Sequence, residues 1–236
     1  MEGWQHYLYL LINVFTLSIP MARSFDARAP YYKLWKPLFL SITIVGAFFI
    51  VWDVIFTMNG VWGFNDDYLV GFRIFHLPIE EWLFFVCVPY SSVFIYFVLN
   101  FFFPKPALKK SATAIAWAEI VALALLALLF WEQAYTFWTF TFLAIFMLYL
   151  VLVEKAQWLG NFFRAYVLVL LPFLMVNGIL TGSFIEDPIV WYNNAQNFGI
   201  RLGTIPIEDV FYGQLLIMMN VWLLRKFAGP HASPNI

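Results

Sequence analysis

The sequence predicts an all-α membrane protein with seven transmembrane helices, arranged as two parallel three-helix repeats joined by a linking helix. Two observations lead to this fold class. The first is composition: 63% of the 236 residues are hydrophobic and only 11% are charged, a balance outside the range of soluble globular domains. The second is an internal echo, in which GFRIFHLPIEEW at 71–82 returns as GIRLGTIPIEDV at 199–210.

Seven segments approach the roughly 20 apolar residues that a transmembrane helix needs. They lie near residues 4–20, 37–58, 78–102, 111–130, 134–153, 161–181 and 206–227. Pro37, Pro78 and Pro206 are expected at first helical positions. The backbone N–H group at such a position has no partner within the helix, so its absence in proline costs no hydrogen bond. We expect no cleavable signal peptide, because the first residues lack a basic region.

The basic residues predict the orientation of the chain in the membrane. Of 13 Lys and Arg residues, 11 fall in one set of alternating loops, and only Arg73 and Arg201 fall in the other. By the positive-inside rule, the C-terminus is cytoplasmic and the N-terminus lies outside, in what we expect to be a bacterial inner membrane. An interfacial belt of aromatic residues is expected at the outer edge, formed by Trp62, Trp131, Tyr135, Trp191 and Tyr192.

The internal echo extends over both halves of the chain. VWDVIFT at 51–57 pairs with MVNGILT at 175–181, Val61-Trp62 with Val190-Trp191, Gly71-x-Arg73 with Gly199-x-Arg201, and PIEE at 78–81 with PIED at 206–209. Each unit has three spans, so one additional crossing makes the two units parallel about an axis along the membrane normal. We therefore divide the chain into a first repeat at 1–103, a linking helix at 104–132 and a second repeat at 133–236.

Five acidic residues are the candidate catalytic groups: Glu80, Glu81, Glu208, Asp209 and Asp53. The first four begin the third and seventh spans, where acids also complement the helix dipole, so capping is the alternative interpretation. Asp53 lies inside the second span, where an ionisable group is expensive and faces a polar interior or a neighbouring helix. Its counterpart is the neutral Asn177, which suggests one shared site with distinct roles for the two halves.

Further candidates surround these acids and would contact a substrate: Asn177, Trp52, Phe56, Thr57, Trp82, Thr181, Arg73 and Arg201. Aromatic faces can stabilise a cation, and Phe84, Phe85, Phe211 and Tyr212 belong to the same set. The two arginines either anchor to lipid headgroups or pair with a carboxylate, so that one acid stays ionised beside a protonated neighbour. His76 is a further candidate proton donor, and Glu119 is expected to make a helix–helix hydrogen bond. Acids beside aromatic, apolar surroundings favour carbocation chemistry on a hydrocarbon.

The sequence also excludes several classes of protein. A single cysteine, Cys87, excludes a disulfide framework and a cysteine metal cluster, and three histidines are too few for a membrane di-iron oxygenase. We expect no metal and no nucleic-acid partner, since the net charge is only −1. The chain has no G-x-G-x-x-G sequence for a Rossmann-bound flavin, and its last span has no mid-span lysine for a retinal Schiff base.

The PIEE and PIED sequences, the WDVIFT helix end and the tandem three-span units resemble the integral-membrane, non-flavoprotein carotenoid cyclases, over roughly residues 4–227. The resemblance implies lycopene β-cyclase activity without a cofactor, in which an acid protonates the terminal alkene of lycopene and a base removes a ring proton. It assigns these roles to the five acids, without deciding which is acid and which is base. Lycopene, related carotenoids and membrane lipid are the partners implied.

Two departures from an equal repeat, Asp209 for Glu81 and Asn177 for Asp53, leave open whether the halves contribute equally. The alternatives within the enzyme class are an ε-cyclase, a cyclase of C50 carotenoids or a hydratase. A carotenoid-binding protein or a proton-coupled transporter is the alternative from another class, because parallel repeats with intramembrane acids also occur in transporters. The sequence predicts no particular oligomeric state.

Overall fold

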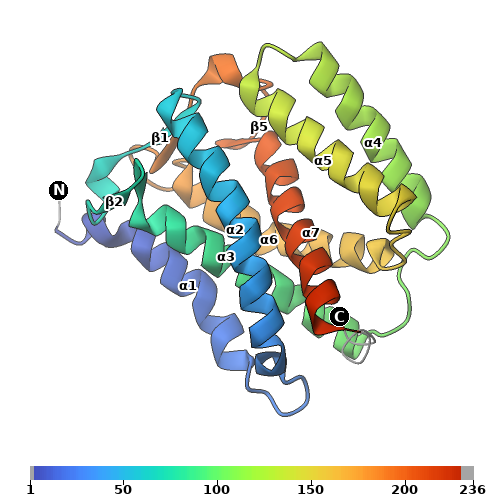
Figure 1. Cartoon of the computed structure of the whole chain (residues 1–236). Helices are drawn as coiled ribbons and strands as arrows, with labels where there is room; N and C mark the ends of the chain where they lie inside the picture. The colour runs from blue at the N-terminus through green and yellow to red at the C-terminus, as the bar shows by residue number, and fades with distance from the viewer. Residues whose placement is uncertain (1–2, 230–236) are drawn as a thin grey trace.

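The computed structural model describes residues 3–229, and seven α-helices form most of this part of the chain (Figure 1). They are α1 (Leu8–Arg23), α2 (Trp35–Met58), α3 (Ile79–Phe102), α4 (Ala112–Leu129), α5 (Ala134–Leu152), α6 (Leu159–Leu180) and α7 (Glu208–Ala228). Each helix lies over one of the seven predicted spans. The helical fold class is therefore confirmed.

Five of the described helices, α2 to α6, are long and apolar enough to cross a membrane. The other two fall outside this set for different reasons. Helix α1 has only 16 residues, and α7 begins with Glu208 and Asp209 and ends near Arg225 and Lys226. The helices are compatible with a multi-pass membrane protein, and the count of seven crossings stays a prediction.

Six short strands, which we did not predict, occur in the loops that follow α2 and α6 within residues 3–229. They are β1 (Trp62–Phe64), β2 (Arg73–Ile74), β3 (Leu77–Pro78), β4 (Val190–Tyr192), β5 (Arg201–Leu202) and β6 (Ile205–Pro206). Strands β2 and β3 form one hairpin, and β5 and β6 form another. Strand β1 pairs antiparallel with β4, so that Trp62 lies opposite Tyr192 and the two loops are joined.

The prediction that three prolines occupy first helical positions is wrong. Helix α2 begins at Trp35, before Pro37, while Pro78 and Pro206 belong to strands β3 and β6. Both strand prolines lie opposite an arginine of their hairpin, Arg73 or Arg201. These strands tolerate proline because they are only two residues long. The missing N–H group of proline therefore does not interrupt an extended ladder of hydrogen bonds.

Apart from an additional 3-10 turn at Tyr31–Leu34, the order of elements in residues 8–102 recurs in residues 134–228: two helices, a strand, a short 3-10 turn, a hairpin and a helix. The 3-10 turns, Asp66–Tyr68 and Asn194–Gln196, are each capped by an asparagine side chain, that of Asn65 or Asn193. Helix α2 packs on α7, and α6 packs on α3, so the middle helix of each half lies on the last helix of the other. The two halves are thus interlocked; their relation by an axis along the membrane normal stays a prediction.

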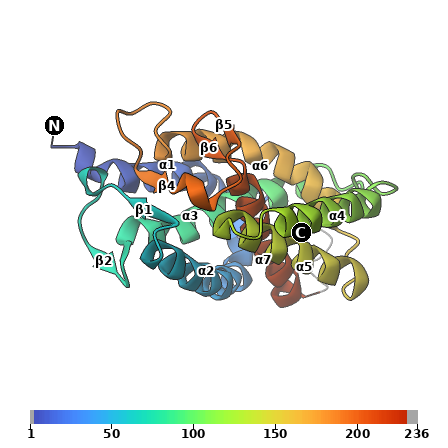
Figure 2. The ribbon, with the colours of Figure 1, turned by 90° about the horizontal axis from the view of Figure 1, so that it is seen from above.

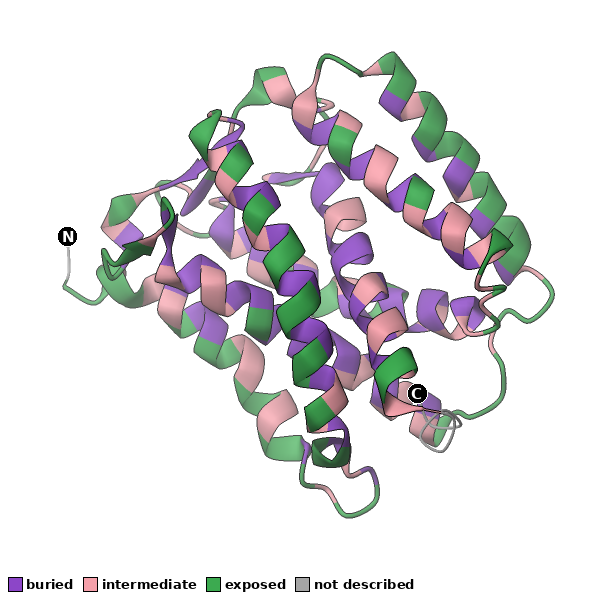
Figure 3. Ribbon diagram, viewed as in Figure 1, coloured by how far each residue is buried: buried purple, intermediate pink, exposed green. Residues whose placement is uncertain are grey.

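Helix α7 contributes to the centre of the molecule, whereas α4 lies at its edge. Figure 3 shows α7 mostly buried and α4 exposed over much of its surface, and Figure 2 shows α4 beside α5 on one side of the bundle. The outward faces carry large apolar side chains, such as Phe15, Val51 and Leu128, which are 71%, 60% and 70% exposed. Such faces suit helices surrounded by lipid. Glu119 of α4 interacts with Gln214 of α7, the kind of helix–helix contact that we predicted.

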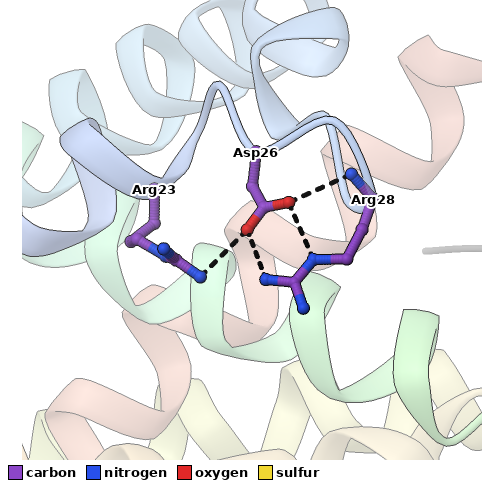
Figure 4. A network of polar contacts seen from close by, with 3 residues as sticks. All are labelled: Arg23, Asp26 and Arg28. Carbon is purple, nitrogen blue, oxygen red and sulfur yellow. Dashed lines mark hydrogen bonds and ion pairs between the residues drawn. The ribbon is translucent and has the colours of Figure 1, made fainter.

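The loop between α1 and α2 is held by a cluster of charges (Figure 4). Asp26 Oδ2 lies 2.9 Å from Arg23 Nη2 and 2.8 Å from Arg28 Nη2. Hydrogen bonds from Arg28 hold the pKa of the Asp26 carboxyl well below its usual value. This loop belongs to the basic set that we expect on the cytoplasmic side, and the cluster is separate from the predicted site.

Candidate functional site

The PIEE and PIED sequences meet at a small pocket between the two halves, which we call the acid pocket. Its volume is about 50 Å³. Residues from α1, α2, α3, α5, α6 and α7 and from strands β1 and β4 line it: Tyr9, Asp53, Trp62, Phe64, Glu81, Phe84, Tyr135, Phe173, Asn177, Leu180, Thr181, Val190, Tyr192, Asp209 and Tyr212. Both halves therefore form its walls.

The first half contributes a pair of carboxyl groups to the acid pocket. The Trp62 indole N–H donates to Asp53 Oδ1 at 2.5 Å, and the Thr57 hydroxyl donates to the same oxygen at 3.2 Å. The Tyr9 hydroxyl donates to Glu81 Oε2 at 2.5 Å. Asp53 and Glu81 also interact directly, carboxyl to carboxyl. Two carboxyl groups in contact favour a state in which one carries a proton, because two negative charges repel in an apolar environment.

The second half contributes one carboxyl group that is surrounded by donors. The Tyr135 hydroxyl donates to Asp209 Oδ1 at 2.5 Å. Asp209 Oδ2 accepts from Asn177 Nδ2 at 3.2 Å and from the Tyr192 hydroxyl at 3.1 Å. Burial raises the pKa of the Tyr192 phenol well above its usual value, so it stays a donor near neutral pH. These three donors favour the ionised form of the Asp209 carboxyl group, whereas its burial opposes ionisation.

Glu80 and Glu208 occupy a different position and do not line the acid pocket. Their side chains are fully buried, and each anchors the loop that precedes its helix. The backbone N–H of Val70 donates to Glu80 Oε1 at 2.7 Å, and that of Phe198 donates to Glu208 Oε1 at 2.5 Å. Within residues 3–229, the second oxygen of each carboxyl group has no hydrogen-bond partner. Adjacent helical residues point about 100° apart, so the first acid of each pair faces the loop and the second faces the pocket.

The two predicted arginines close their hairpins. Arg73 forms an ion pair with Asp66 at 2.5 Å and donates to the His76 carbonyl at 2.9 Å. Arg201 donates to Asn194 Oδ1 at 2.7 Å and to the Thr204 carbonyl in its own hairpin turn. Neither hydrogen-bonds to an acid-pocket carboxyl group in the described part of the chain, so the alternative contact with lipid headgroups stays a prediction. His76 is exposed at a hairpin turn, away from the acid pocket.

The predicted aromatic residues divide into two groups. Phe84 and Tyr212 line the acid pocket, and behind them the Trp52 ring centroid lies 5.0 Å from that of Tyr212. Phe56 packs on Trp62 with centroids 4.9 Å apart. The remaining three lie elsewhere: Trp82 donates to the Ile74 carbonyl, Phe85 packs on Phe49, and Phe211 packs on Phe140. Thr181 lines the pocket, and Thr57 reaches it through Asp53.

The predicted aromatic belt is partly wrong. Trp62 and Tyr135 are only 6% and 2% exposed, because both line the acid pocket, where they donate to carboxyl groups. Trp131 and Trp191, at 65% and 43% exposure, fit the surface position that the belt requires. Tyr192 is half-buried and also lines the pocket.

The donors Tyr9 and Tyr135 were not among the predicted site residues, although the sequence held a signal for them. They are 126 residues apart, whereas Glu81 and Asp209 are 128 apart and Asp53 and Asn177 are 124 apart. Extending the repeat into the first span of each half would have paired the two tyrosines. Each then donates to the second acid of its own half.

Comparisons with known proteins relate this chain to lycopene cyclases. A family model described as lycopene cyclase matches residues 6–99 and 132–227, two segments that together contain every acid-pocket residue. A bifunctional lycopene cyclase/phytoene synthase from Leptosphaeria maculans is 30% identical over 76 residues, which cover 28% of this chain and 13% of that protein. The match thus spans a small part of the relative's length. No solved structure matches this chain.

Proposed function

The chain belongs to the lycopene cyclase family, and on that premise we propose that it is a lycopene β-cyclase that works by acid–base catalysis without a cofactor. The acid pocket carries this proposal, because it brings three carboxyl groups from the two halves into one aromatic, apolar enclosure. At about 50 Å³ the pocket is smaller than the roughly 150 Å³ cavity that binds a benzene ring, so an end group enters only when the surrounding side chains move apart.

The Asp53–Glu81 pair supplies the proton. One member of the pair protonates C2 of the terminal C1=C2 alkene, which leaves a cation at C1. The C5=C6 double bond attacks this cation, forming the C1–C6 bond and moving the positive charge to C5. The indole of Trp62 and the ring of Tyr212 line the pocket and can stabilise these cations through their electron-rich faces.

Asp209 acts as the base. Its carboxylate, held by Tyr135, Tyr192 and Asn177, removes the proton from C6, and the C5=C6 double bond reforms within the ring. One proton is gained at C2 and one is lost from C6, so the reaction is an isomerisation. Each β-ionone ring is made in this way, giving γ-carotene and then β-carotene.

Expression in a lycopene-accumulating bacterial host tests the activity. We expect pigment extracts to contain γ- and β-carotene. Unchanged lycopene, in a host whose membranes contain the protein, would contradict the proposal and favour a carotenoid-binding or transport protein. An ε-ring or a hydroxylated end group would indicate the same carbocation with a different terminating step, and activity only on a C50 carotenoid would indicate a different substrate.

Isotope labelling tests the proton transfer itself. Membranes assayed in D₂O should produce rings that carry deuterium at C2, because the donated proton comes from a carboxyl group that exchanges with solvent. Mass spectrometry of the β-carotene detects this label. Rings without deuterium, formed at a normal rate, would exclude protonation by the Asp53–Glu81 pair.

The proposal extends to the setting of the reaction. We place the enzyme in a bacterial inner membrane, with the acid pocket toward the outer face and the C-terminus in the cytoplasm. The two PIE sequences then face each other as parallel repeats at one depth. Reporter fusions to the C-terminus and to the β2–β3 hairpin would test this orientation.

A further inference from the structure

Two apolar hollows lie at corresponding places, each between the first and last helices of one half and the middle helix of the other. The first, which we call the α6 groove, has a volume of about 170 Å³ and lies between α1, α3 and α6. Its lining includes Thr16, Pro20, Ser92, Pro172, Phe173 and Val176. The second, which we call the α2 hollow, has a volume of about 430 Å³ and lies between α5, α7 and α2. Its lining includes Phe48, Phe142, Ile145, Phe146, Met219 and Trp222.

The α6 groove shares a wall with the acid pocket. The ring of Phe173 lines both cavities, and it packs against Gly213 of α7. A Cβ atom added at Gly213 would lie 2.7 Å from Phe173 Cζ, so any larger residue at this position would clash with the ring. The Phe173 side chain therefore forms part of the wall between the groove and the acid pocket.

The α2 hollow, by contrast, is closed off from the acid pocket. It shares no lining residue with the pocket, and Trp52 lies between them. The Trp52 ring centroid is 5.0 Å from that of Phe142, on the hollow side, and 5.0 Å from that of Tyr212, on the pocket side. Phe48 adds a further ring, 5.6 Å from Phe142.

The two hollows differ in the size of the side chains at equivalent positions of the repeat. Counting from Tyr9 and Tyr135, Thr16 and Pro20 correspond to Phe142 and Phe146. Counting from Asp53 and Asn177, Val176 and Pro172 correspond to Trp52 and Phe48. Four aromatic rings beside the α2 hollow thus stand where the α6 groove has smaller side chains, and the smaller set lines the α6 groove.

We infer that the α6 groove holds the polyene chain of the carotenoid while its end group reacts in the acid pocket. This inference rests on the proposed function and names the side of the molecule through which the substrate extends. No lining residue of the groove is ionisable, which suits a hydrocarbon chain. Its rim residues Phe15, Ile19 and Met175 are 71%, 65% and 69% exposed, so the groove opens toward the surrounding lipid.

Filling the α6 groove tests this inference by activity. Val176→Trp and Thr16→Phe introduce the aromatic residue types of the matching positions beside the α2 hollow, and each should lower kcat/KM for lycopene at least about tenfold, the scale of altered apolar fit. Met219→Trp, in the α2 hollow, is the matched control and should stay within about twofold of wild type. Normal turnover in both groove variants, or an equal loss in the control, would overturn the inference. Only variants that are extracted as folded, monodisperse protein are compared.

Cysteine protection tests the same groove without turnover. Ile19 and Ile145 are counterparts, 65% and 59% exposed, on the rims of the groove and of the hollow. The only native cysteine, Cys87, is buried. Each isoleucine is replaced by cysteine in a Glu81→Gln background and labelled with a lipid-soluble maleimide. Lycopene at about ten times its Kd should slow labelling of Ile19→Cys about tenfold and leave Ile145→Cys unchanged.

The two experiments separate the groove from the function. Protection of Ile19→Cys, together with a wild-type protein that never forms rings, would support the groove and contradict the proposed cyclase. Active wild-type protein with no protection at Ile19→Cys would overturn the groove alone, as expected if lipid acyl chains occupy it instead.

Discussion

The two halves of the molecule share a scaffold and differ where they meet the acid pocket. In each half a tyrosine of the first helix donates to the second acid of the last helix, and the first acid anchors a loop. The first half adds a second carboxyl group, Asp53, whereas the second half adds the amide of Asn177. The shared contacts therefore maintain the architecture, and the unequal pair supports our proposal that one half donates the proton and the other removes it.

The largest effect is expected when the carboxyl pair of the first half is broken at Glu81. Glu81→Gln keeps the shape and the contact with Tyr9 but removes the ionisable group, so we expect a loss of about 10²–10⁴ in lycopene turnover. Turnover is measured in membranes with matched amounts of protein. Activity within tenfold of wild type would mean that Glu81 is not part of the acid–base machinery.

The next effect compares Asp53 with its counterpart directly. Asp53→Asn gives the first half the side chain of the second, and we expect about a hundredfold loss, because Glu81 then lacks its carboxyl partner. The reciprocal Asn177→Asp should cost less, about tenfold, because it removes one of three donors to Asp209. Equal losses in the two variants would indicate that the halves do the same work.

A smaller effect on turnover is expected at the buried acids outside the pocket. Glu80→Gln and Glu208→Gln retain an acceptor for the loop N–H groups, so turnover should stay within about tenfold of wild type. The alanine variants lose this acceptor and should lower the free energy of unfolding by about 1–3 kcal/mol, measured by chemical unfolding in detergent. A hundredfold loss of turnover in either glutamine variant, with unchanged stability, would restore to these acids the catalytic role that the sequence suggests.

The smallest effect is expected far from the acid pocket, at Asp26. Its pKa is lowered in the folded protein by Arg28, so its stabilising contribution is present above the pKa of the unfolded chain and is lost as the pH falls through the folded pKa. Because the cluster is exposed, Asp26→Asn should change the thermal midpoint little at pH 7 and leave turnover unchanged. A clear loss of turnover would mean that this loop contributes to the reaction.

Much of the fold followed from local patterns. Long apolar runs predicted the helices, because each helix satisfies its own backbone hydrogen bonds within one stretch of chain. The echo of PIEE in PIED indicated that two acidic helix starts share one site, and both second acids do line one pocket. The β1–β4 ladder escaped prediction, because its two strands are three residues long and lie 128 residues apart, so no local periodicity marks them.

The sequence by itself determined a helical, lipid-compatible protein with duplicated acids, since composition and repetition are properties of the chain. Only the tertiary structure decided which acid of each pair faces the pocket, because that depends on helix rotation against the other half. The interlocking of α2 with α7 and of α6 with α3 sets this rotation. It turns Glu81 and Asp209 inward and leaves Glu80 and Glu208 to hold the loops.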